Sequence, residues 1–225
     1  MSANDETQAP PPAPEPAANT DVGFPSVPGT ADLPAELQDY PLQAGIVRQE
    51  EYSRLLPLVK WLLAIPHFFV LVFLGIGALF VHFIAFFAVL FTGRYPESLF
   101  NYMVGVLRWA WRVSAYVMLM VDPYPPFSLD DDPGYPARYE IAYPESVERW
   151  RPLVAWLLII PYWFVASVLA YAASIVVFIA FFAILFTKRF PEGMFSFVEV
   201  TLRWSTRAGA YAYYLVTKYP PFAWG

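Results

Sequence analysis

The chain of 225 residues contains no cysteine, which excludes disulfides, thiolate metal sites and cysteine nucleophiles. It has only two histidines, His67 and His82, and no cluster of carboxylates accompanies them, so we expect neither a metal site nor a proton relay. The basic residues are too few and too dispersed to bind nucleic acid. We therefore predict a protein without a bound metal, cofactor or nucleic acid.

Catalytic signatures are also missing. The sequence has no Ser-His-Asp set, no glycine-rich loop that would cradle a phosphate and no convincing pair of carboxylates. The acidic run of Asp130, Asp131 and Asp132 lacks the spaced ligands and the final glutamate of a calcium-binding loop, so we interpret it as a solvated linker. These absences favour a protein that is not an enzyme.

Charged residues make up only 15% of the chain, whereas 58% is hydrophobic and 19% aromatic. The apolar residues are concentrated in two runs, 58–92 and 153–187. A run of about 35 residues would form a helix of roughly 50 Å, which is longer than the ~30 Å hydrocarbon core of a bilayer. The two runs therefore predict membrane segments.

Each long run is predicted to be one helix, bent at Pro66 or Pro161, instead of a hairpin of two short spans. A hairpin needs a breaker near its middle, and only the first run has one, at Gly75 and Gly77. The second run has Ala170-Tyr171-Ala172 at the same place.

The chain is a tandem repeat without gaps. Tyr40-Pro41 recurs 95 residues later as Tyr135-Pro136, and the same offset holds to the end of the chain. Such a long ungapped match indicates a duplication. The predicted organisation is a disordered Pro-rich and acidic tail over 1–39, membrane repeat 1 over 40–127, an acidic linker over 128–134 and membrane repeat 2 over 135–225.

The expected fold is an all-α integral membrane protein of two long helical hairpins with a short strand-like lead-in to each repeat. The four predicted helices cover about 55–92, 97–121, 150–187 and 192–217. The second helix of each repeat carries charge, so it either crosses the membrane with its polar stripe sheltered or lies at the interface; crossing is favoured here.

With four transmembrane helices, both repeats have the same orientation, and the tail, the linker and the C-terminus share one side of the membrane. Most basic residues lie on that side, so the positive-inside rule predicts cytoplasmic termini. The two lead-ins would face each other on this side and could pair.

Two arginine pairs are the candidate binding site. Arg108 with Arg112, and Arg203 with Arg207, are spaced one helical turn apart and share a face with a tyrosine, Tyr116 or Tyr211. Guanidinium groups bind phosphate and carboxylate in a bidentate fork, so we predict an anion or anionic lipid as the ligand.

A purely structural role is the alternative for these arginines. Glu199 lies one turn before Arg203 and could pair with it, whereas repeat 1 has Val104 at that place and leaves Arg108 without a partner in its helix.

Several phrases resemble a known family. They are Arg54-Leu55-Leu56-Pro57-Leu58-Val59-Lys60-Trp61-Leu62-Leu63-Ala64-Ile65-Pro66-His67, Phe91-Thr92-Gly93-Arg94-Tyr95-Pro96 and Leu107-Arg108-Trp109. The chain resembles the domain-of-unknown-function 4389 family of bacterial, often actinobacterial, membrane proteins, in which the domain is often duplicated. The resemblance covers both repeats and implies a bacterial inner-membrane protein, without any known activity.

The function we predict is that of a non-enzymatic scaffold or accessory protein, which binds anionic lipid or an acidic partner through the paired arginines. Its partners would be membrane lipids and either another protein or a second copy. The alternatives are a small transporter or channel for an anionic solute and, third, a membrane enzyme acting on lipids.

Overall fold

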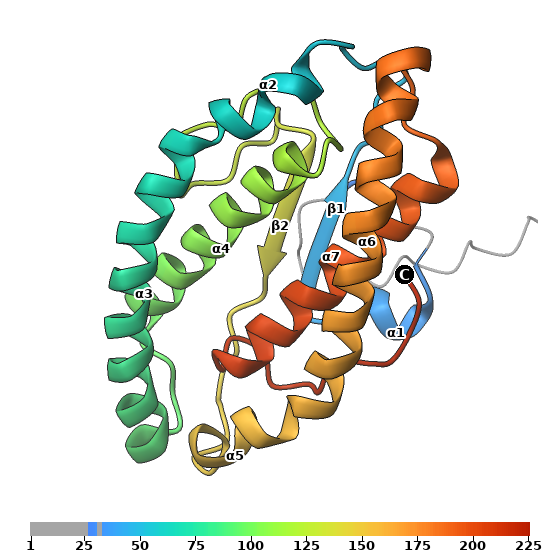
Figure 1. Ribbon diagram of the computed structural model, residues 1–225. Coiled ribbons are helices and arrows are strands. Elements are labelled where there is room, and N and C mark those ends of the chain that lie inside the picture. Colours follow the sequence, from blue (N-terminus) through green and yellow to red (C-terminus); the bar gives the residue numbers. More distant parts are fainter. Residues whose placement is uncertain (1–26, 31–32) are drawn as a thin grey trace, which may run out of the picture.

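A computed structural model describes residues 27–30 and 33–225 (Figure 1). The described chain is mostly helical and contains a small sheet of two strands. The elements of repeat 1 are β1 (Leu42–Ile46), α2 (Leu56–Leu63), α3 (Ile65–Thr92) and α4 (Glu97–Val117), and a short helix α1 (Ala35–Gln38) precedes them. Those of repeat 2 are β2 (Ala137–Ile141), α5 (Arg151–Leu158), α6 (Ile160–Thr187) and α7 (Glu192–Ala212).

The end of the predicted tail is structured. Helix α1 lies within the stretch expected to be disordered, and Val27, Leu33 and Leu37 are buried against the rest of the chain. These apolar side chains supply the contacts that the Pro-rich part of the tail lacks. The rest of the predicted tail, 1–26 and 31–32, is outside the described residues.

The long apolar runs are single bent helices, as predicted. Only Ala64 separates α2 from α3, and only Ile159 separates α5 from α6. Pro66 and Pro161 lie in the first turn of α3 and α6. N–H groups in the first turn have no acceptor within the helix, so a proline costs no hydrogen bond there. Each run is therefore helical on both sides of the break at Ala64 or Ile159, where Figure 1 shows the chain change direction.

Two helices of the described chain are long and apolar enough to cross a membrane, Leu56–Thr92 and Ile160–Thr187. Their most apolar windows have mean hydropathies of 2.6 and 2.7 and are only 6% and 17% buried. Core helices of soluble proteins hide such surface. Helices α4 and α7 do not meet the same test, so four transmembrane helices are not confirmed.

The two lead-ins pair across the repeats. Strand β1 runs antiparallel to β2, with Ala44 opposite Tyr139, its equivalent 95 residues later. Strand β1 packs on α7 and β2 packs on α4, so each strand covers the second helix of the other repeat. The predicted pairing of the lead-ins is confirmed, and in addition the strands are exchanged between the repeats.

Two equivalent backbone hydrogen bonds join the ends of the long helices. The N–H of Tyr52, before α2, donates to the carbonyl of Lys188 after α6, at 2.8 Å; the N–H of Val147, before α5, donates to the carbonyl of Gly93 after α3, at 2.9 Å. Helices α3 and α6 therefore run in opposite directions, as Figure 1 shows. Each turn after a long helix therefore contacts the chain just before the bent helix of the other repeat.

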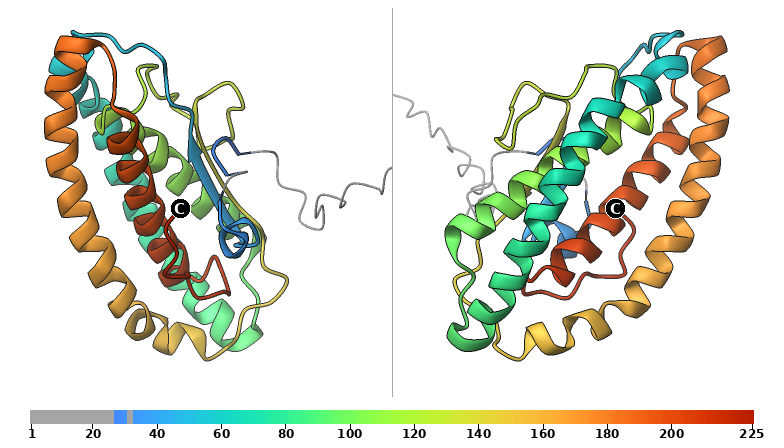
Figure 2. Two further views of the ribbon diagram at one scale, coloured as in Figure 1. Left: turned by 90° about the vertical axis from the view of Figure 1, so that its right-hand side faces the viewer. Right: turned by 60° about the vertical axis from the view of Figure 1, so that its left-hand side comes forward.

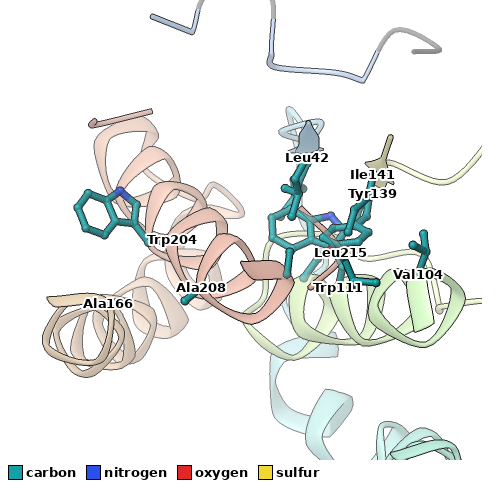
Figure 3. Packing of buried hydrophobic residues seen from close by; sticks show 14 of the residues in the cluster. Leu42, Val104, Trp111, Tyr139, Ile141, Ala166, Trp204, Ala208 and Leu215 are labelled. Atoms are coloured by element: carbon teal, nitrogen blue, oxygen red, sulfur yellow. The ribbon is translucent and has the colours of Figure 1, made fainter. Parts of the chain in front are cut away.

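The molecule has three layers. In the side views of Figure 2, α3 and α6 form one outer layer, α4 and α7 the middle layer, and the sheet lies on the opposite side. Figure 3 shows Leu42 and Tyr139 of the two strands beside Trp111 of α4 and Leu215, all of them buried. The main core is therefore between the sheet and the middle layer, which leaves the outer faces of α3 and α6 uncovered.

Candidate functional site

The four arginines of the predicted site lie on the face of α4 and α7 that is turned toward the sheet. Arg112, Arg203 and Arg207 are buried, and the side chain of Arg108 is 13% exposed. The opposite faces of α4 and α7 pack on the apolar helices α3 and α6. The polar stripe that made these helices poor membrane spans is thus directed away from the apolar layer.

The first arginine of each pair binds the edge of the sheet. Arg203 Nε donates to the carbonyl of Ala44 at 2.7 Å, and Arg108 Nε donates to the carbonyl of Tyr139 at 3.1 Å. The two carbonyls belong to the central pair of strand residues and point outward from the two-stranded sheet. The arginines therefore satisfy backbone groups that an exposed sheet edge leaves unpaired.

The acidic partners of these two arginines differ. Arg203 pairs with Glu199 in its own helix at 2.6 Å, the structural alternative considered from the sequence. Arg108 pairs with Glu140 of β2 at 2.9 Å. Burial raises the pKa of Glu140 although Arg108 opposes the shift. Sequence reasoning missed Glu140, because it belongs to the other repeat and no helical spacing links it to Arg108.

The second arginine of each pair holds a chain segment that follows its own helix. Arg112 donates to the carbonyls of Ser128 and Asp130, the latter at 3.2 Å, and Arg207 donates to the carbonyl of Gly225 at 2.9 Å. Among the described residues, neither arginine forms an ion pair with an Asp or Glu side chain. Both therefore carry a buried positive charge that main-chain oxygens solvate.

Some donors of the second arginines remain unused within the described chain. Nε of Arg112, and Nε and Nη1 of Arg207, make no hydrogen bond of normal geometry there, although Arg207 interacts with the phenol of Tyr162. Buried N–H groups without an acceptor are costly, so their presence is a reason to look for a ligand.

The two tyrosines of the predicted site contact other cations. The ring of Tyr116 lies 4.9 Å from Nζ of Lys60, and the ring of Tyr211 lies 5.0 Å from the guanidinium of Arg151. The structure thus brings the first arginine of each pair to the sheet and the second to the segment after its own helix, and it places the tyrosines beside α2 and α5.

Lys60 and Arg151 are polar anchors that sequence reasoning did not single out. Lys60 Nζ donates to the carbonyl of Val121 at 2.6 Å and to Asp122 at 2.8 Å, and Arg151 Nη2 donates to the carbonyl of Thr217 at 2.5 Å. Each fixes the segment after α4 or α7. No repeat signal reveals them, because the cation sits at a different place in each copy.

The histidines pack with aromatic rings. His67 stacks on Phe127 at 4.1 Å between ring centroids, and its Nδ1 accepts a hydrogen bond from Trp109 Nε1 at 3.0 Å. His82 stacks on Tyr214 at 4.9 Å. In the part of the chain that the structure describes, no three His, Asp or Glu side chains approach closely enough to hold a metal ion.

Comparisons with known proteins give one match. No curated protein and no solved structure is significantly similar to this chain. The family called "Domain of unknown function (DUF4389)" matches twice, over residues 56–128 and 149–223, which together make up more than half of the chain. The two matches coincide with the bent helix and second helix of each repeat. The chain therefore belongs to the DUF4389 family, with its domain duplicated.

Proposed function

We propose that this chain is a membrane-embedded, non-enzymatic scaffold or accessory protein of the bacterial inner membrane. One observation carries the proposal: in two long helices of high hydropathy, only 6% and 17% of the most apolar windows are buried. Such a surface requires lipid or another apolar partner. The water-facing part of the molecule would then be the sheet with its capping arginines and acidic linker. The excess of basic residues beside the helix ends favours a cytoplasmic location for both termini, by the positive-inside rule.

We further propose that the second arginine of each pair binds an oxyanion, either the phosphate of an anionic lipid or a carboxylate of an acidic partner. Support comes from Arg112 and Arg207, which have N–H groups without an acceptor of normal geometry and no Asp or Glu side chain in ion-pair contact within the described chain. Arg108 and Arg203 are poorer candidates, because the sheet, Glu140 and Glu199 already occupy their donors.

The test is lipid retention by the purified protein. The double variant Arg112→Gln/Arg207→Gln should lose co-purifying anionic phospholipid in native mass spectrometry. A matched control, Arg48→Gln/Lys218→Gln, removes two exposed basic groups outside the two pairs and should keep most of that lipid. Equal lipid content in the first variant and the wild type would refute a lipid ligand at these arginines. Loss of a protein partner instead of lipid would assign the site to an acidic peptide.

Transport of an anionic solute, one of the alternatives from the sequence, gains less support. Three apolar cavities open between the helices, with volumes of about 380, 120 and 180 Å³. None of these three is lined by an arginine of the two pairs. An anion path would need cations along a continuous polar channel.

A further inference from the structure

We infer that the two bent helices lie parallel to the membrane plane within one leaflet, with the sheet in water, instead of crossing the bilayer. This inference rests on the proposed membrane embedding and adds how the helices are oriented in the membrane. The acyl chains of a single leaflet would cover the free faces of α3 and α6.

The two repeats are related by an approximate two-fold axis through the sheet. The axis passes between Ala44 and Tyr139, because these equivalent residues face each other. It reverses α3 relative to α6 and closes the two bent helices into a ring: Arg54 before α2 donates to the carbonyl of Phe186 near the end of α6, at 3.3 Å. Figure 1 shows the two long helices on either side of α4 and α7.

Crossing helices would place the sheet at the wrong depth. If α3 and α6 both crossed, the two-fold axis would lie in the membrane plane, and Ala44 and Tyr139 would be at mid-bilayer. The ion pairs of Arg108 with Glu140 and of Arg138 with Asp131 would be at the same depth. Irregular chain and charged side chains are not tolerated against lipid there.

A flat orientation resolves this conflict. With the axis along the membrane normal, α3 and α6 form the deepest layer, α4 and α7 lie above them, and the sheet and acidic linker reach water. A helix with its side chains is about 10 Å thick, which fits within the ~15 Å hydrocarbon depth of one leaflet, half of the bilayer value. The outer layer therefore needs no second leaflet to cover it.

The exposed side chains of the two long helices have the chemistry expected for burial in one leaflet. Large apolar side chains line the free faces of both long helices; Phe69, Phe80 and Phe164, for example, are 66%, 67% and 69% exposed. Exposed basic residues gather at the two ends of the ring, with Arg54, Lys188 and Arg189 at one end and Arg94 and Arg149 at the other. Both ends would then meet headgroups of the same leaflet, and anionic lipids would attract them.

The absence of cysteine makes the orientation directly testable. Ser53 and Ser98 are exposed and flank the two ends of the bent helix α2–α3, whereas Gly134 is exposed in the linker. Each is replaced singly by cysteine, and an impermeant maleimide is applied to intact cells and to inverted membrane vesicles. Ile76→Cys, on the free face of α3, is the matched lipid-facing control. All four variants are labelled again after denaturation.

For a flat helix, Ser53→Cys, Ser98→Cys and Gly134→Cys react in the same preparation and in that one alone, and Ile76→Cys reacts only after denaturation. Labelling of the Ser53 and Ser98 variants from opposite sides overturns the orientation but leaves the membrane scaffold standing. Failure of either variant to react before denaturation also overturns it, because the proposal places both at the water surface. Release of the whole chain by an alkaline carbonate wash would overturn the scaffold proposal as well.

Discussion

The sharpest prediction concerns the buried pair of Arg203 and Glu199. Replacing Arg203 by leucine removes three hydrogen bonds, to the carbonyls of Ala44 and Gly29 and to the carboxylate of Glu199, at 2.7, 3.0 and 2.6 Å. It also leaves Glu199, whose side chain is only 12% exposed, without its cation. Breaking a buried ion pair from one side costs about 3–5 kcal/mol, because the remaining charge stays buried.

Repeat 1 suggests a second substitution to combine with Arg203→Leu, namely Glu199→Val. Val104 occupies the place of Glu199 there, and α4 still forms and packs on its strand. Glu199→Val alone removes the acceptor of the Ile46 N–H, at 2.9 Å, and leaves the buried Arg203 without its carboxylate, so it should also cost about 3–5 kcal/mol. In the double variant no carboxylate is left uncompensated. Its destabilisation should therefore be smaller than the sum of the two single effects by about 1–3 kcal/mol.

Thermal unfolding in detergent, followed by tryptophan fluorescence, measures these differences. For a chain of this size, a loss of 3–5 kcal/mol lowers the midpoint by roughly 6–20 °C. Strictly additive losses would show that the two side chains are not coupled. An Arg203→Leu protein that melts like the wild type would refute the role of the arginine as the cap of the sheet edge.

Three further predictions use the same measurement. At Gly45, an added Cβ would lie 1.7 Å from the carbonyl oxygen of Pro28, so Gly45→Ala should destabilise strongly, whereas Gly75→Ala, with open space around it, should be neutral or stabilise by up to about 1 kcal/mol. Lys188 has a φ of +58°, as Gly93 does at +69°; Lys188→Gly should therefore stabilise by roughly 1 kcal/mol and Gly93→Ala should destabilise by a similar amount. Burial raises the pKa of Glu140, so the folded state binds its proton more tightly than the unfolded state does. The free energy of unfolding should therefore fall as the pH rises above 4.5, the ordinary pKa of a glutamate. Glu140→Gln should make this pH dependence weaker, and an unchanged pH dependence would contradict the raised pKa of Glu140.

The sequence predicts the parts of this fold that depend on local pattern. Apolar runs without turn residues indicate the long helices. Pro66 and Pro161 indicate their bends, because a proline has no N–H to donate and its ring clashes with the preceding turn of the helix. The offset of 95 residues predicts that both repeats share one fold, and the lead-ins do pair. Each of these conclusions requires only residues within a single helix or a comparison of equivalent positions.

The environment of the arginines could not be predicted in the same way. Their main partners are backbone carbonyls of a strand from the other repeat, and any residue type can present a carbonyl. A stripe on one helix face indicates that the arginines share a direction, but not what lies in that direction. Glu140 was missed for the same reason, whereas the partner within the helix, Glu199, follows from its spacing.

Strand exchange gives a physical reason for keeping two repeats in one chain. A single repeat would have one strand without a pairing partner and one arginine without its carbonyl, and an isolated strand is not stable in water. Two separate copies could supply both, but only by paying the entropy of association. Joining them through the segment after α4 makes the pairing of β1 with β2 intramolecular, at a high effective concentration. The segment that joins the repeats also carries the oxygens that Arg112 binds, so the linker is itself part of the polar layer between the helices and the sheet.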